Sequence, residues 1–545
     1  MTETPAVQIF TKPDCVLCKN SKRVLDTAGI PYEELDTATA TRLADSAAYF
    51  SGRPTLPQVF VGGQWIDGQD DLKALAEAGR LREVVESARG ALPLDSVTDE
   101  DLARGAQDVP LVDHLSRTDG THDSDPESWP ILRFYQRIFG FWPNTLAYLY
   151  RWPTAYKLFV YCQNIASLQK AAATVGTPVV SIIGYGSSAA QGCTYCMTHS
   201  ITMFKGLDVD VDALKAARRG DAGPGNPFGP FEVAVVDLAA QATRNAVTDK
   251  AVEAVRRTAD QGRTKAVDPD EALEAVTQIG ASMGFFNVFN DLSGLAIEGD
   301  WAQVAKSKGI DGGRHAAEDE NPDNLAHGVP EGGPAAEEML ARYASEVGDV
   351  TEFTTRHLGL MPAWIAAWPD RTRSLHAYMY ATLMNGDGDA VIAGELKHLM
   401  ARVAAASRGH TYLAAVEGFM AAHVAEDPER AAARARHAYR AAIGDPESME
   451  PFDAKEQSAL RLAWLSAQSP LVTPRRFVEP LVEMYDERAI TELIVCCAVA
   501  SLVQRFVAVV RPDIEPEVGT FLAGNGLDAD LLAVRYPADG RPAHR

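Results

Sequence analysis

Two Cys-x-x-Cys pairs constrain this chain more than any other feature of its sequence. Cys15 and Cys18 form the first pair, and Cys193 and Cys196 form the second. Each pair is expected to open a helix, where free N–H groups and the positive end of the helix dipole favour a thiolate. The chain has only seven cysteines, an odd and sparse set that does not suit a disulfide scaffold. The pattern therefore indicates redox or metal sites.

Bulk composition limits the partners of the chain. Its 545 residues exceed what one hydrophobic core holds, so several domains are expected. The net charge of −23 argues against nucleic acid, because phosphate binding needs a basic face. The sequence has no apolar run near the ~20 residues that cross a bilayer, and no secretory signal at MTETPAVQIF. We therefore expect a cytoplasmic protein without nucleic-acid or membrane partners.

The first 90 residues follow an α/β pattern, because short strand-like runs alternate with helical ones. The expected elements are a strand at 7–11, a helix at 19–28, a strand near 32–35, the PQVFV strand, a turn at Gly62-Gly63, a QWI strand and a last helix at about 70–87. This order predicts one small domain over residues 1–90.

The rest of the chain is predicted to be helical segments joined by linkers. Residues 91–130 and 301–347 are rich in Asp, Glu, Pro and Gly, which is typical of linkers, although part of the first segment could pack as an arm. Residues 131–300 and 348–515 have helical periodicity and abundant alanine, and residues 516–545 form a C-terminal tail. The predicted fold class is multidomain, with an α/β N-terminal domain followed by two all-α repeats.

The two helical segments resemble each other in sequence. Residues 186–204 align without gaps with residues 403–421, and GFWP at 140–143 aligns with GLMP at 359–362. The shared order of these landmarks favours a true repeat over a chance match between Ala-rich helices.

The second repeat has lost the dithiol. His410, Leu413 and Val416 stand where the first repeat has two cysteines and a histidine. Glu395 and His398 lie upstream, with no dithiol to serve. We interpret this repeat as a scaffold that completes an oligomer, and His410 as a structural or surface histidine rather than a remnant base.

The first pair has the features of a thiol–disulfide exchange site. Cys15 is expected to be the nucleophile, with Lys12 as a nearby cation, and Cys18 is expected to resolve the mixed disulfide. Pro57 follows Thr-Leu and precedes a strand, so we expect a cis proline beside the dithiol. Zinc normally takes four ligands and no second pair lies in this domain, so no metal is expected.

The segments FTKPDCVLC, TLPQVFVGG and IDGQDDL resemble glutaredoxins over residues 5–88. The resemblance implies a thioredoxin-like fold with no bound cofactor. It implies a co-substrate, either a glutathione- or mycothiol-like thiol or a thioredoxin-type reductant, and an upstream disulfide reductase as partner. Val16 and Leu17 stand where glutaredoxins often have Pro and an aromatic residue. The thiol-binding residues that the resemblance implies are Lys12, Leu56, Pro57, Gln69 and Asp70.

The second pair continues into a histidine, Cys193-Thr-Tyr-Cys196-Met-Thr-His199. On a helix, residues three apart share a face, so a thiolate can lie beside an imidazole with a second thiol ready to close a disulfide. This combination suits peroxide reduction through a sulfenic acid. Buried apolar cysteines and a zinc site are the alternatives, although a fourth zinc ligand is not evident.

GCTYCMTHS resembles the signature of the AhpD-like, carboxymuconolactone decarboxylase superfamily. The resemblance implies an all-helical fold that oligomerises, here as a trimer of tandem repeats. It also implies that Cys196 attacks, Cys193 resolves and His199 belongs to a proton relay. The upstream glutamate of peroxidase members is absent, since no Asp or Glu occurs between Tyr150 and Leu207. We expect another base, for example Tyr185.

The remaining polar and thiol candidates are assigned to the core. Cys162, Cys496 and Cys497 lie in apolar helical runs and are expected to be buried thiols, although Cys162 could approach Cys193. Asn287 and Asn290 are expected to be helix-packing residues.

The predicted function is thiol–disulfide redox catalysis. The preferred hypothesis is a thiol-dependent hydroperoxide peroxidase whose helical dithiol is reduced by the fused glutaredoxin-like domain. Fusion raises the effective concentration of the reductant to roughly mM. The alternatives are a disulfide reductase or electron relay without peroxidase activity, and a non-redox helical scaffold with a redox-sensing domain. The substrate is accordingly a hydroperoxide or a disulfide.

Overall fold

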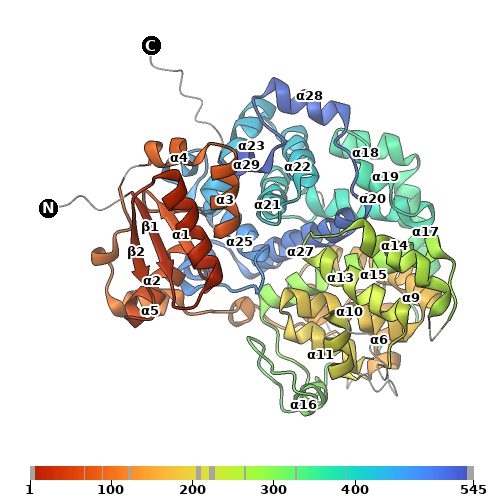
Figure 1. The fold of residues 1–545 in the computed structure, drawn as a ribbon. Coiled ribbons are helices and arrows are strands. Elements are labelled where there is room, and N and C mark those ends of the chain that lie inside the picture. The colour runs from red at the N-terminus through yellow and green to blue at the C-terminus, as the bar shows by residue number, and fades with distance from the viewer. Residues whose placement is uncertain are drawn as a thin grey trace.

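A computed structural model gives the fold of most of the chain (Figure 1). The described residues are 6–66, 68–88, 90–120, 124–203, 210–219, 227–262, 265–325, 328–386 and 388–536. A small α/β domain comes first and a largely helical body follows, which confirms the predicted fold class at that level. The segment predicted as a C-terminal tail, residues 516–545, contains two helices, and it is described up to residue 536.

The N-terminal domain is a four-stranded mixed sheet with helices packed on it. The strand order is β2-β1-β3-β4, in which β1 is parallel to β2 and antiparallel to β3. All five residues of β1 are buried, as a central strand requires. Its elements are β1 (Val7–Thr11), α1 (Val16–Ala28), β2 (Tyr32–Asp36), α2 (Thr41–Ser51), β3 (Gln58–Val61), β4 (Gln64–Trp65), α3 (Gln69–Glu77) and α4 (Leu81–Ser87).

Local chemistry explains where the structure differs from the expected elements of this domain. Helix α1 begins three residues before the predicted start because the Cys15 sulfur caps it, accepting a hydrogen bond from the Cys18 N–H at 3.1 Å. The single predicted helix at 70–87 is two helices, separated at Gly79, which has a φ of 70°. Helix α2 was not predicted.

The acidic segment that follows, predicted as a linker, is packed against the body. It contains η1 (Leu94–Ser96), α5 (Asp99–Ala106) and η2 (Leu111–His114), and both Leu102 and Leu111 are fully buried. The Asp108 carboxylate accepts a hydrogen bond from the Thr473 N–H at 2.7 Å, and the Val109 N–H donates to the Thr473 carbonyl at 2.9 Å. These contacts tie residues 91–120 to a loop of the second helical half.

The helical body has two halves. The first half contains α6 (Trp129–Phe139), α7 (Asn144–Leu149), α8 (Pro153–Leu158), the π-helical η3 (Phe159–Leu168), α9 (Gln169–Val175), α10 (Thr177–Gln191), α11 (Thr194–Thr202), α12 (Val211–Arg218), α13 (Pro230–Thr243), α14 (Asp249–Thr258), η4 (Ala259–Gln261), α15 (Pro269–Ser293) and α16 (Gly299–Ser307).

The second half contains α17 (Ala336–Val347), α18 (Val350–Leu358), α19 (Ala363–Ala366), α20 (Asp370–Met384), α21 (Gly394–Ser407), α22 (Thr411–Val424), α23 (Pro428–Ala442), α24 (Pro446–Met449), α25 (Ala454–Ser466), α26 (Arg475–Met484), α27 (Glu487–Val510), α28 (Pro516–Gly524) and α29 (Leu531–Arg535). The aligned segments 186–204 and 403–421 form the same helix–turn–helix unit in both halves, with a glycine at positive φ in each turn.

The two halves meet along α15 and α27, which lie side by side (Figure 1). A Cβ at Gly284 would stand 2.5 Å from the Ser501 carbonyl oxygen, so the absence of a side chain there permits the close approach. Helix α27 is also long and apolar enough to cross a membrane, but 94% of the residues in its apolar stretch are buried within the protein. That burial is typical of a core helix.

The N-terminal domain is docked on the second half and on the end of the chain. Trp65 packs edge-to-face on Trp464, with ring centroids 5.2 Å apart, and the Arg476 guanidinium lies over the Tyr49 ring at 4.2 Å. Tyr536, after α29, is 1% exposed in the core of the α/β domain and donates to the Ile66 carbonyl at 2.8 Å. The domain therefore shares a continuous interior with the body.

We predict that Trp464→Ala destabilises the whole chain by about 3–5 kcal/mol, the usual cost of deleting a large buried aromatic side chain. Trp464 is 1% exposed and touches both the body and the docked domain. Chemical denaturation measures the free energy of unfolding. Val304→Ala, at a side chain that is 40% exposed, is the matched control and should change it by no more than about 0.5 kcal/mol. Equal effects of the two variants would contradict the docking role.

Candidate active site

The first dithiol lies at the surface of the α/β domain. Cys15 and Cys18 form a disulfide with Cα atoms 5.2 Å apart. The two residues between them, Val16 and Leu17 in the first turn of α1, are 68% and 52% exposed, so apolar side chains lie at the surface next to the disulfide. Such a surface offers a contact to another thiol or disulfide, as thiol exchange requires access to the sulfur.

The predicted thiol-binding residues come from three segments around this disulfide. Lys12 is exposed just before it, and the Leu56–Pro57 peptide bond is cis at the start of β3. Gln69 and Asp70 begin α3, and the Gln69 side-chain oxygen is buried without a hydrogen-bond partner. Their role in thiol binding stays a prediction.

The second dithiol has the same local structure as the first. Gly192 ends α10 with a φ of 97°, and a Cβ there would stand 3.2 Å from Pro470. Cys193 then caps α11, and its sulfur accepts a hydrogen bond from the Cys196 N–H at 3.4 Å. Both sulfurs are thus held at the first turn of a helix, where the dipole favours a thiolate.

Cys196 faces a cavity and Cys193 does not line it. The cavity has a volume of about 460 Å³ and its walls are mainly apolar. Cys196, His199 and Asn290 line it together with Phe139 and Phe286. The amide of Asn290 donates a hydrogen bond to the Cys196 sulfur at 3.2 Å, which stabilises a thiolate. Asn290 is therefore a site residue, and the prediction that it serves helix packing alone is wrong.

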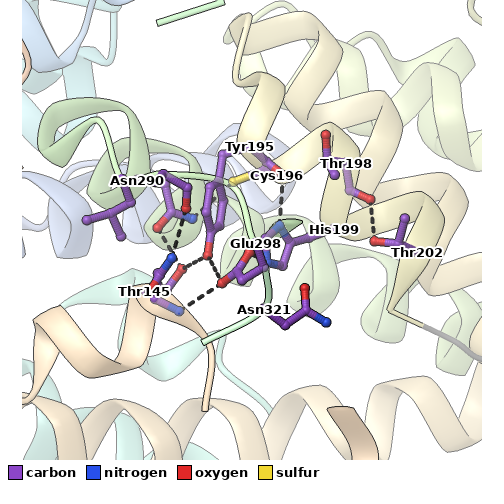
Figure 2. Close-up of polar contacts among 12 residues, drawn as sticks. Thr145, Tyr195, Cys196, Thr198, His199, Thr202, Asn290, Glu298 and Asn321 are labelled. Carbon is purple, nitrogen blue, oxygen red and sulfur yellow. Dashed lines mark hydrogen bonds and ion pairs between the residues drawn. The ribbon is translucent and has the colours of Figure 1, made fainter. Parts of the chain in front are cut away.

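A buried glutamate, Glu298, contacts the imidazole of His199 (Figure 2). The His199 Nε2 atom is 3.1 Å from Glu298 Oε2, an ion-pair distance without the alignment of a hydrogen bond. Tyr195 stacks on His199 with ring centroids 4.0 Å apart, and its hydroxyl donates to Glu298 Oε1 at 2.9 Å. The Asn144 N–H donates to the same oxygen at 2.9 Å. Oε1 of Glu298 therefore accepts two hydrogen bonds, and Oε2 contacts the imidazole of His199.

Glu298 provides the carboxylate that is missing upstream of the dithiol. It lies between α15 and α16, about a hundred residues after the dithiol. Tyr185, the base proposed instead, packs in the cluster between α10 and α13 and does not line the cavity. The one local signal is the position of Glu298 directly before a helix start, in Ile-Glu-Gly-Asp-Trp.

The electrostatics of Glu298 favour its charged form. Burial acts to raise the pKa of this carboxyl, but the attraction of His199 and the N–H of Asn144 outweigh it and hold the pKa below its ordinary value. Glu298 is therefore a carboxylate at neutral pH, and it supports positive charge on His199.

Cys193 occupies a sealed polar pocket of its own. Its sulfur is 0% exposed, and burial, the Cys196 sulfur and the charge of Asp291 together raise its pKa well above the ordinary value. Such a thiol does not ionise unaided near neutral pH. The contrast with Cys196 favours the assignment of Cys196 as the attacking thiol and Cys193 as the resolving thiol.

Cys193 belongs to a group of three side chains that could hold a metal ion. Its sulfur, an Asp291 oxygen and a His315 nitrogen lie within 4.8 Å of one another in the described residues. The His315 Nδ1 atom contacts the Leu295 carbonyl at 2.8 Å, and its Nε2 atom lies 3.1 Å from Asp291 Oδ1. Three protein ligands are one fewer than a structural zinc site takes.

The second half contributes a buried cation. Arg505 on α27 is 2% exposed, and its three guanidinium nitrogens have no hydrogen-bond partner among the described residues. Burial lowers its pKa to about 9, while the charges of Cys196, Cys193 and Asp291 attract it. The second half therefore adds positive charge to the site.

The remaining cysteines are free and buried, as the sequence predicts. Burial raises the pKa of Cys162, whose charge partners are Tyr343 and Tyr378 rather than Cys193. His410 caps α22 at the position equivalent to Cys193, and burial lowers its pKa to about 3. It is a neutral structural histidine.

Comparison with known proteins identifies the first domain. Residues 7–66 match the glutaredoxin family model. The chain is 37% identical to glutaredoxin 3 of Escherichia coli over 75 residues, which covers 14% of this chain and 90% of that protein. This N-terminal domain belongs to the glutaredoxin family. It is therefore a thiol–disulfide oxidoreductase domain.

Two further comparisons involve a fusion protein and a solved structure. The chain is 41% identical over 68 residues to the hybrid peroxiredoxin hyPrx5 of Haemophilus influenzae, which covers 12% of this chain and 28% of that protein. A structure of the debrominase Bmp8 with 2,3,4-tribromopyrrole covers 33% of this chain and 92% of that chain, with 20% identity and a TM-score of 0.28. That score is too low to support an inference.

We predict that Glu298→Gln slows alkylation of Cys196 in the reduced protein by about tenfold, equivalent to about 1.4 kcal/mol. The amide removes the negative charge that supports a proton on His199. Glu298 has a lowered pKa and stays ionised, so the effect should persist between about pH 6 and pH 8. Mass spectrometry of iodoacetamide-treated protein measures the rate. Glu320→Gln, at an exposed glutamate nearby, is the control; equal rates in the two variants would exclude Glu298 from the relay.

Proposed function

We propose that this chain is a thiol-dependent peroxidase for apolar organic hydroperoxides, as the resemblance of its helical part to AhpD-like proteins implies. The observation that carries the proposal is the contact of one apolar cavity with Cys196, Asn290 and the His199–Glu298 pair. Such a cavity binds a hydrocarbon group and leaves the polar O–O end beside the thiol. The relationship to a hybrid peroxiredoxin in the glutaredoxin part agrees with this link.

The residues around the cavity account for the first chemical step. His199, which lines the same cavity, takes up the proton of Cys196 across that cavity, while Asn290 holds the sulfur and Glu298 supports the imidazolium. The Cys196 thiolate attacks the terminal peroxide oxygen, so an S–O bond forms and the O–O bond breaks. The departing alkoxide takes the proton from His199 and leaves as an alcohol. Cys196 is then a sulfenic acid.

The second step closes the dithiol. Cys193 lies at the adjacent cap position and condenses with the sulfenic acid of Cys196, which gives a disulfide and water. We propose that the glutaredoxin dithiol, through Cys15, then reduces this disulfide by thiol exchange, and that a low-molecular-weight thiol or a disulfide reductase regenerates Cys15.

Consumption of cumene hydroperoxide by the full chain, with a thiol-regenerating system, tests the proposal. Wild type should turn over, and Cys196→Ser should fall to the uncatalysed rate because the attacking sulfur is gone. Cys15→Ser should stop after about one equivalent, because the helical dithiol is oxidised once and not regenerated. Cys162→Ser, at a buried cysteine outside the site, is the control. If wild type consumes no more than Cys196→Ser, the peroxidase assignment fails and disulfide substrates become the next test.

If the cavity binds the organic group, narrowing it should slow a large hydroperoxide more than a small one. We predict that Ala172→Leu, which adds volume to its wall, lowers kcat/KM for cumene hydroperoxide by about tenfold and leaves kcat/KM for hydrogen peroxide within about twofold. Ala189→Leu, in the same half but outside the cavity lining, provides the comparison. Equal losses for both peroxides would show that the cavity does not bind the organic group.

A further inference from the structure

The structure holds a second acid–base pair that the first chemical step does not use. Asp291, near the end of α15, and His315, between α16 and α17, lie beside the sealed Cys193 rather than beside the cavity. Asp291 is 2% exposed and His315 is 4% exposed. Their ring nitrogen and carboxylate oxygen are 3.1 Å apart.

The hydrogen bonds of this pair require a shared proton. A carbonyl oxygen only accepts, so the His315 Nδ1 atom, 2.8 Å from the Leu295 carbonyl, carries a hydrogen. The Nε2 atom then faces Asp291 Oδ1 at 3.1 Å, and two lone pairs at that distance would repel. One more proton therefore lies between them, either on the imidazole or on the carboxyl.

Asp291 also lies close to Cys193. The Cys193 sulfur, an Asp291 carboxylate oxygen and the His315 nitrogen lie within 4.8 Å of one another, and the charge of Asp291 acts on the Cys193 thiol. Among the described residues, the other charges that act on Asp291 include the guanidinium groups of the buried Arg505 and the half-buried Arg408. The thiol therefore has a neighbouring proton acceptor, with cations around it that stabilise negative charge.

We propose that Asp291, positioned by His315, is the acid–base catalyst for Cys193, separate from the His199–Glu298 relay that serves Cys196. This inference rests on the proposed function, since Cys193 reacts in the second step. Asp291 lies within 4.8 Å of the reacting thiol and exchanges its proton, so it is the catalytic residue. His315 acts through Asp291 and is a positioning residue.

The protons and electrons balance over the cycle. When Cys193 attacks the sulfenic acid, its proton passes to the Asp291–His315 pair, the S–S bond forms and the S–O bond of Cys196 breaks. The departing hydroxide takes a proton from solvent through the cavity, because His199 gave its own to the alkoxide in the first step, and water leaves. When a thiol later attacks Cys196 through the cavity, that thiol releases its proton to solvent, and Cys193 departs as a thiolate that recovers its proton from Asp291.

The segment that brings His315 is held against the dithiol helix. The Thr194 hydroxyl donates to the Gly312 carbonyl, and the backbone of Ile297 pairs with that of Ala317. The region predicted as the linker 301–347 therefore closes one side of the Cys193 pocket and supplies one of its functional groups.

Disulfide closure tests the proposal with two oxidants. The reduced full-length protein is mixed with one equivalent of cumene hydroperoxide, or with hydroxyethyl disulfide, which forms a mixed disulfide on Cys196 without peroxide chemistry. Quenched samples are analysed by mass spectrometry for the Cys193–Cys196 disulfide and for trapped Cys196 sulfenic acid. The variants are Asp291→Asn and His315→Gln, compared with His199→Asn.

We expect Asp291→Asn and His315→Gln to slow closure by about tenfold or more with either oxidant, and to let the sulfenic acid accumulate. The first step should stay within about threefold of wild type, whereas His199→Asn should slow that step. Closure in the two variants should accelerate about tenfold per pH unit, because solvent must then remove the proton from Cys193. A merely structural role would not create that pH dependence.

Two results would overturn the inference. One is closure with hydroxyethyl disulfide at the wild-type rate and with the wild-type pH profile in both variants. The other is one tightly bound metal ion per chain in wild type that is lost in His315→Gln. Failure of wild type to consume cumene hydroperoxide, with slowed closure of the variants after hydroxyethyl disulfide, would instead reject the peroxidase function and support the role of Asp291.

Discussion

The contact between α15 and α27 is the interaction on which both the fold and the site depend. Gly284 lets the two backbones approach, and the helices then bury each other for most of their length. The end of α15 carries Asn290 to the sulfur of Cys196 and Asp291 to the thiol of Cys193. Arg505 on α27 adds a guanidinium from the other half. A half that has lost its own cysteines therefore still shapes the chemistry of its neighbour.

Different environments give different roles to two cysteines that are only three residues apart. Cys196 opens on an apolar cavity and accepts a hydrogen bond from an amide on its sulfur, so it can meet a substrate. Cys193 is sealed from that cavity, and desolvation favours its neutral thiol. A reaction that needs both sulfurs must therefore remove two protons by different routes. The two acid–histidine pairs, one beside each cysteine, provide those routes.

Local signals made part of this structure predictable from sequence. Periodicity and capping patterns involve residues within a few positions of each other. They therefore predict the strand at 7–11, the helix that begins at Cys15 and the turn at Gly192. Glu298 and His315 reach the dithiol through tertiary packing of segments about a hundred residues downstream, which leaves no local pattern. The acidic composition of residues 91–120 suggested a flexible linker, but a few buried leucines were enough to fix it on the body.

The second half shows that the residue types alone do not make the site. Its Tyr380 hydroxyl donates to Glu417 at 2.5 Å, and Glu417 contacts His398 Nδ1 at 2.7 Å, which repeats the tyrosine, glutamate and histidine of the first half. The other nitrogen of His398 contacts Asn385 at 3.2 Å. Both nitrogens of His199 are engaged as well, Nδ1 with the Tyr195 carbonyl at 3.0 Å and Nε2 with Glu298 at 3.1 Å. What separates the two networks within the described residues is therefore the thiol and the cavity, which only His199 has beside it.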